Sequence, residues 1–111
     1  MRIYVDIDET ICNTPENRNY LESVPIYKRI RRINELYDRG HEIFYWTARG
    51  SSRLDDKERI ETLTKLTKEQ LDSWNVKYTD VFLGKRNYDL FICDKVINTE
   101  DFFKYEDIKN L

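Results

Sequence analysis

The sequence has few cysteines and no long hydrophobic run. Its two cysteines, Cys12 and Cys93, form no CxxC pair and have no histidine near them. We therefore expect neither a zinc site nor a thioredoxin-like redox motif, and we expect both thiols to be reduced. The longest apolar runs are far shorter than the ~20 residues that a membrane-spanning helix needs. A role within a membrane is not indicated.

A secretory leader and a strong charge of one sign are also missing. Alternating apolar residues begin by Ile3, which leaves no room for a charged segment followed by a long apolar one, so we expect no signal peptide and a cytoplasmic location. The formal net charge is -2. Such a balance gives no long-range attraction for polyanions, so nucleic acid is not indicated as a partner by the overall field.

What is present is typical of one folded domain. The chain has 111 residues, of which 40% are hydrophobic and 36% are charged. This length and composition suit a single domain over residues 1–111 with one modest core and a densely charged surface. There is no internal repeat and no low-complexity segment.

Apolar runs and helical periodicity alternate along the chain. Runs rich in β-branched and aromatic residues predict strands over residues 3–7, 42–46, 81–83 and 90–93. Helical spacing predicts a helix over 26–37, ended by Gly40, and a longer one that starts near Asp55 or Asp56 and ends at Asn75. Thr99 is expected to cap a short last helix, and residues 12–24 to form a loop.

This alternation predicts an α/β fold, with a doubly wound, Rossmann-like parallel sheet and helices on both faces. Such sheets bind ligands beyond the carboxyl ends of their strands. Asp6, Asp8, Thr47 and Asp94 follow strands at that edge, and Lys85 follows the third strand. Taken singly, each could be a turn residue or a surface residue. Their shared placement favours a functional site.

The pair Asp6 and Asp8 suggests phosphoryl chemistry. Two positions apart on an extended backbone, both carboxylates point to the same side. Magnesium usually takes one or two protein carboxylates together with phosphate, and Asp6 and Asp94 could supply them. Asp6 could then attack phosphorus once cations neutralise the phosphoryl oxygens. Asp8, close to another carboxylate, is expected to have a raised proton affinity and to act as general acid and base.

Four segments resemble the motifs of the haloacid dehalogenase superfamily, in the order of that family. They are YVDIDET (4–10), FYWTAR (44–49), GK (84–85) and YDLFICDK (88–95). The resemblance implies that Asp6 is the nucleophile of a phosphatase and that Asp8 is its acid and base, with Thr10 bracing their loop. It implies that Thr47 and Lys85 bind the phosphoryl group. Magnesium would be held by the Asp6 side chain, the Asp8 main-chain carbonyl and Asp94.

Within that superfamily, the segments look most like the small capsule-biosynthesis phosphatases. This finer resemblance implies a phosphorylated sugar as substrate and a single domain without a cap. Discrimination among substrates would then fall to residues such as Arg49, Asn13 or Asn17. Arg49 has an equal alternative interpretation, an ion pair to the acidic cluster.

Two other functions stay open. An open site and the basic run of residues 28–32 would also suit a phosphatase acting on nucleotides or nucleic-acid ends, although that run reads more simply as a solvated helix face. A receiver-like signalling module also uses strand-end aspartates, Thr, Lys and magnesium, but it holds the phosphoryl group. The aromatic residues Phe102, Phe103 and Tyr105 are expected in the core or in a contact between subunits of a homo-oligomer.

Overall fold

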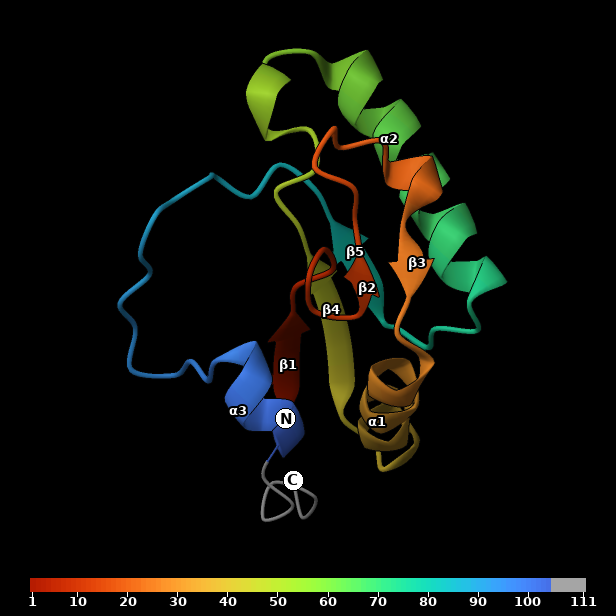
Figure 1. Cartoon of the computed structure of the whole chain (residues 1–111), viewed down its shortest axis with the longest axis vertical. Helices are drawn as coiled ribbons and strands as arrows, with labels where there is room; N and C mark the ends of the chain where they lie inside the picture. Colours follow the sequence, from red (N-terminus) through yellow and green to blue (C-terminus); the bar gives the residue numbers. More distant parts are fainter. Residues whose placement is uncertain (105–111) are drawn as a thin grey trace.

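The structure, a computed structural model, describes residues 1–104. Figure 1 shows a small sheet with two long helices beside it and a wide loop on the opposite side. The strands are β1 (Arg2–Val5), β2 (Cys12–Asn13), β3 (Val24–Pro25), β4 (Glu42–Trp46) and β5 (Asp80–Phe82). The helices are α1 (Tyr27–Asp38), α2 (Lys57–Ser73) and α3 (Thr99–Lys104), and short 3₁₀ turns span Tyr20–Glu22 and Ser51–Arg53.

The main sheet is parallel, with strand order β1-β4-β5. Tyr4 pairs with Phe44, and Phe44 pairs with Asp80, so the carboxyl ends of the three strands lie at one edge. The predicted α/β class and the parallel sheet are confirmed. A second, two-stranded antiparallel sheet joins β2 to β3 within the segment expected to be a loop.

One face of the sheet carries the hydrophobic core. Alternate strand residues point to it, among them Val5, Tyr45 and Val81, and all three are buried. They pack in one cluster with residues of both long helices, namely Ile30, Ile33 and Leu36 of α1 and Leu71 of α2. Both helices therefore cover the same face, because both place their apolar stripes against one continuous core.

No helix among residues 1–104 covers the opposite face of the sheet. Tyr4, Trp46 and Phe82 remain partly exposed on it, and the Tyr4 and Phe44 rings stack at 5.1 Å between centroids. Helices on both faces were expected, and here the structure differs. Within residues 1–104, β5 is followed by an irregular segment over 83–98 in place of a helix that could cross this face.

The predicted fourth strand over 90–93 is wrong. Residues 84–98 form a wide loop that arches away from β1 before the chain returns as α3 (Figure 1). Leu90 and Ile92 are 77% and 88% exposed. Phe102 and Phe103 of α3 pack against the core together with Ile3 of β1. The last helix therefore covers the core beside this edge strand.

The helix boundaries follow their sequence signals closely. Gly40, at φ 96°, comes two residues after α1, and Asn75, at φ 59°, comes two residues after α2, both in the left-handed region that ends helices. Asp56 caps α2 by accepting a hydrogen bond from the Arg59 N–H. At α3 the expected cap is displaced by one residue, because the side chain of Asn98, not Thr99, accepts from the Glu100 N–H at 2.9 Å. Tyr105 lies outside the described residues.

No helix in the described part of the chain has the length and apolar character needed to span a membrane.

Candidate active site at the carboxyl edge of the sheet

The acidic loop after β1 is anchored by its apolar neighbours. Ile7 and Ile11 are fully buried, and the Ile7 carbonyl accepts the N–H groups of Thr10 and Ile11 at 3.1 and 2.9 Å. Glu9 takes a positive φ of 63°, which lets the chain turn within this short loop. Asp6 and Asp8 flank a buried residue and are thereby held at the surface of the core.

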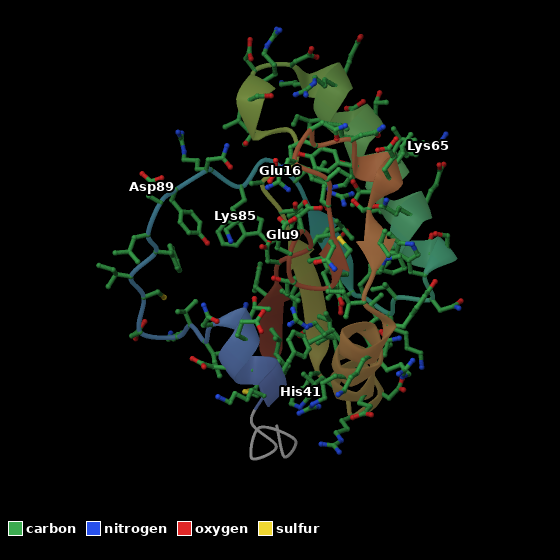
Figure 2. The ribbon with its side chains drawn as sticks, in the orientation of Figure 1. Glu9, Glu16, His41, Lys65, Lys85 and Asp89 are labelled. Atoms are coloured by element: carbon green, nitrogen blue, oxygen red, sulfur yellow. The ribbon has the colours of Figure 1, made fainter. Side chains whose placement is uncertain are left out.

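Both carboxylates open into one polar hollow of about 430 Å³. Thr47, at the end of β4, lines the same hollow. Asp6 is exposed to it, whereas the Asp8 side chain is only 14% exposed. The sequence prediction that Asp6, Asp8 and Thr47 come together is therefore met by the geometry. Figure 2 shows Glu9 and Lys85 near the middle of the view and His41 in its lower part.

Arg49 forms a buried ion pair with Asp8. Its Nη2 and Nε donate to the two carboxylate oxygens of Asp8 at 2.9 and 3.1 Å, and its side chain is 2% exposed. Nη1 donates to Gln70 Oε1 at 2.8 Å, while the guanidinium lies 4.5 Å from the centroid of the Tyr20 ring. Of the two interpretations open from the sequence, the structure supports the ion pair. Arg49 is fully engaged before any substrate arrives.

The pKa values of the two carboxyl groups shift in opposite directions. Burial by itself would raise the pKa of Asp8, but the hydrogen bonds and charge of Arg49, with the hydroxyl of Thr14 at 2.5 Å, hold it below the ordinary value. Desolvation raises the pKa of Asp6, against the Ile7 N–H and the charge of Lys85. The expected raised proton affinity of Asp8 is wrong, because the hydrogen bonds and charge of Arg49 outweigh the effect of burial.

Thr47 connects the strand end to the acidic pair. Its hydroxyl lies 3.5 Å from Asp8 Oδ2 and accepts the Arg49 N–H at 3.2 Å. The residue is 1% exposed. Thr47 therefore orders the turn after β4, as a simple turn role would require, and it also lines the polar hollow.

Lys85 lies close enough to Asp6 to lower its pKa by charge. The Lys85 N–H donates to the Thr47 carbonyl at 3.0 Å, which fixes the backbone beside β4. The preceding Gly84 has φ 77°, and a Cβ there would meet Leu54 Cδ2 at 2.9 Å, so a residue with a side chain would be strained at this turn. The ammonium rests about 5 Å from the Trp46 and Tyr88 rings.

Three other predicted positions have different surroundings. The buried Thr10 exchanges a hydroxyl hydrogen bond with Thr99 at 2.9 Å, so it braces the loop against α3 rather than facing the polar hollow. Asn13 and Asn17 are exposed and line neither of the two main hollows. Their predicted substrate contacts are therefore not supported by this arrangement.

Asp94 is not brought to the acidic pair. It is exposed in the loop 84–98 and lines neither main hollow. Within residues 1–104 no three acidic, histidine or cysteine side chains come together as a metal site. The prediction that Asp94 ends a strand beside β1 is wrong, since its loop forms no strand.

Sequence reasoning missed most of the wall of the polar hollow. Besides the acidic loop and Arg49, the wall includes Arg18, Tyr20, Ser51, Ser52, Arg59 and Asn87. These residues come from a loop, both 3₁₀ turns, the first turn of α2 and the segment after β5. A capping aspartate three residues before Arg59 was visible in the sequence, but the direction of α2 relative to the sheet was not.

The fold is shared with a protein from Vibrio cholerae. Its crystal structure, that of an MCSG target, superposes with a TM-score of 0.81 at 27% identity, over 99% of this chain and 95% of that one. No protein-family model matches the chain, and no curated protein matches it. The likeness supports the fold over nearly the whole chain. The activity has to be argued from the chemistry of the site.

Proposed function

We propose that the protein is a magnesium-dependent phosphatase that hydrolyses phosphate monoesters through an aspartyl-phosphate on Asp6. The observation that carries the proposal is the meeting of Asp6, Asp8 and Thr47 in one open hollow. Lys85 lies near enough to act on Asp6 by charge. The motif resemblance to the haloacid dehalogenase superfamily supports the same roles, and its finer form supports a phosphorylated sugar as substrate.

Asp6 suits the nucleophile because its carboxylate is accessible. It opens to the polar hollow, while Asp8 is held by Arg49 and Thr14. Asp6 attacks phosphorus and the bond to the leaving oxygen breaks. The leaving oxygen keeps the electron pair and takes a proton from solvent in the open hollow, and the phosphoryl group is carried on Asp6. Lys85 neutralises charge on the phosphoryl oxygens, and the Thr47 hydroxyl orients them by hydrogen bonding.

Asp8 suits the base of the second half-reaction. Because Arg49 holds its pKa low, Asp8 is ionised at neutral pH and can take a proton from the water that attacks the phosphoaspartate. The same ion pair opposes the acid role, since a proton on Asp8 would weaken the charge-assisted hydrogen bonds of Arg49.

The donor set at Asp6 fits a magnesium ion. The Asp6 carboxylate is partly desolvated, and within residues 1–104 no cationic side chain donates a hydrogen bond to it. Magnesium is commonly held by one or two protein carboxylates with water and phosphate, so Asp6 and the Asp8 carbonyl would suffice as its protein anchors. The ion would supply charge for the phosphoryl oxygens. Asp94 stays a predicted third ligand that the loop 84–98 would have to carry to the site.

A substrate screen with matched variants tests the proposal. Sugar phosphates, nucleotides, phosphorylated oligonucleotides and p-nitrophenyl phosphate are assayed with and without magnesium. We expect hydrolysis that chelation stops reversibly and that Asp6→Asn reduces by at least about 1,000-fold. Asp55→Asn is the control, because Asp55 is 80% exposed and neither it nor its partner Arg53 lines the hollow.

Three results would contradict parts of this proposal. Full turnover by Asp6→Asn would remove Asp6 as nucleophile. A long-lived phosphorylated protein without turnover, detected by intact mass, would favour the receiver-like function. Faster, steeply salt-dependent hydrolysis of oligonucleotide ends would favour the nucleic-acid function.

A further inference from the structure

Two hollows meet at Asp6, and their walls differ in character. One, of about 560 Å³, lies along β1 and the loop 84–98 and is walled largely by apolar residues such as Tyr4, Leu90 and Phe91. The other is the polar hollow, which also holds Asp8 and Thr47. A substrate that contacts Asp6, Asp8 and Thr47 together must therefore enter the polar hollow.

The charged residues that line the polar hollow form two ion pairs and, among the described residues, leave two groups unpaired, Asp6 and one arginine. Asp8 neutralises Arg49 at 2.9 Å, and Glu9 neutralises Arg18 at 3.1 Å. Arg59 also lines this hollow, and no carboxylate among the described residues lies within ion-pair distance of it. Arg59 is therefore the cation among the described lining residues that has no carboxylate partner, while Asp6 is the unpaired carboxylate.

Nearby acidic residues are already engaged. Asp56 accepts the main-chain N–H of Arg59 at 3.0 Å as the cap of α2, and Asp55 pairs with Arg53 at 3.5 Å. The guanidinium of Arg59 donates to the hydroxyl of Ser52 at 3.3 Å. This neutral contact positions Arg59 beside the hollow and leaves its charge available to a ligand.

Hydroxyl and amide groups surround the same charge. Asn87 donates to Ser51 Oγ at 2.9 Å, which joins the segment after β5 to the 3₁₀ turn after β4. At Gly50, a Cβ would meet Ile60 Cδ1 at 2.6 Å, so the turn sits directly on α2 and brings Ser52 close to Arg59. These groups can exchange hydrogen bonds with the hydroxyls of a leaving alcohol.

We infer, on the basis of the proposed function, that the leaving alcohol is polyhydroxylated and carries a second anionic group, which Arg59 binds. The phosphoryl group lies at Asp6, the hydroxyls face Ser51, Ser52 and Asn87, and the second anion pairs with Arg59. A carboxylate and a second phosphate share this chemistry. Arg59 is then a specificity-determining residue, and the substrate class is a phosphorylated sugar acid or a sugar bisphosphate.

Substrates matched in shape and different in charge test this inference. Sorbitol 6-phosphate has a neutral far end, 6-phosphogluconate carries a carboxylate there, and sorbitol 1,6-bisphosphate carries a phosphate. We expect kcat/KM for one of the two charged compounds to exceed that for sorbitol 6-phosphate by at least about tenfold. Which compound is preferred identifies the anion.

The variants separate recognition from folding. Arg59→Gln should bring the ratio of charged to neutral substrate close to one, and Arg59→Lys should restore part of it. Arg53→Gln is the control, because Arg53 is 60% exposed and lines neither main hollow. The inference is overturned if the unmodified protein shows no preference for a charged over the neutral substrate, or if Arg53→Gln removes that preference equally. It is also overturned if Arg59→Gln lowers kcat/KM by the same factor for every substrate, p-nitrophenyl phosphate included.

If no monoester is hydrolysed, the proposed function fails while the binding inference is still decided. Calorimetric titration of the three compounds then measures the same ratio as dissociation constants. A tenfold preference for a charged compound that Arg59→Gln removes would support the inference, and equal affinities would overturn it.

Discussion

Two segments of the chain carry acidic residues that the sequence places at strand ends, and the fold holds them very differently. The loop after β1 is anchored by Ile7 and Ile11, which are fully buried, and by the ion pair of Asp8. The loop 84–98 exposes Ile92 and Asp94 to solvent. The position of a carboxylate thus depends on its neighbours in sequence. Apolar neighbours fix the loop that carries it only when they are buried in the core.

The largest expected difference concerns Arg49. Arg49→Ala leaves Asp8, whose side chain is only 14% exposed, without its cationic partner. Breaking a buried ion pair in this way typically costs about 3–5 kcal/mol. We expect the free energy of unfolding to fall by that amount in urea titrations. Arg53→Ala, at an exposed pair, should change it by no more than about 0.5 kcal/mol. Equal effects of the two substitutions would show that the acidic loop is not held by Arg49.

A smaller effect is expected at the two aspartates, where replacing Asp8 and replacing Asp6 should change the free energy of unfolding in opposite directions. The folded pKa of Asp8 lies below the ordinary 3.8, so its ionised form stabilises the fold above that pH, and the contribution is lost as the pH falls through the folded pKa. Asp8→Asn should therefore lower stability at pH 7, by about 1.5–3 kcal/mol for a lost charged hydrogen bond. The folded pKa of Asp6 lies above 3.8, so ionisation destabilises the fold as the pH rises past that value.

Asp6→Asn should accordingly raise stability at pH 7, by only a few tenths of a kcal/mol because the carboxylate is exposed and screened. Urea titrations of both variants at pH 7 and near pH 3 measure the two effects. Both differences from the unmodified protein should shrink toward pH 3. Changes of the same sign at pH 7 would contradict the opposite pKa shifts of the two groups.

The smallest effects on stability are expected in the loop 84–98. Ile92→Ser and Asp94→Asn should each change the free energy of unfolding by less than about 0.5 kcal/mol, since both side chains are exposed. If Asp94 is a magnesium ligand, Asp94→Asn should still raise the magnesium concentration needed for half-maximal activity. A loss above about 1 kcal/mol in Ile92→Ser would show that this loop packs against the sheet in solution.

Local signals predicted much of the scaffold. β4 covers Glu42–Trp46 as its aromatic run indicated, and α2 begins after Asp56, one of the two aspartates expected near its start. The run over 90–93 looked equally like a strand and is not one. A short apolar run becomes a strand only when a neighbour pairs with it, and pairing depends on contacts distant in sequence.

The sequence by itself predicted three of the strands and the ends of the two long helices, because periodicity and capping are properties of nearby residues. Their alternation predicted a parallel sheet, and with it the convergence of Asp6, Asp8 and Thr47 at one edge. Only the tertiary structure decided that Arg49 pairs with Asp8 and that Arg59 lines the hollow without a carboxylate partner among the described residues. The partner of an arginine is whichever carboxylate the fold brings within about 3 Å, and that choice depends on how α2 and the loop after β4 pack.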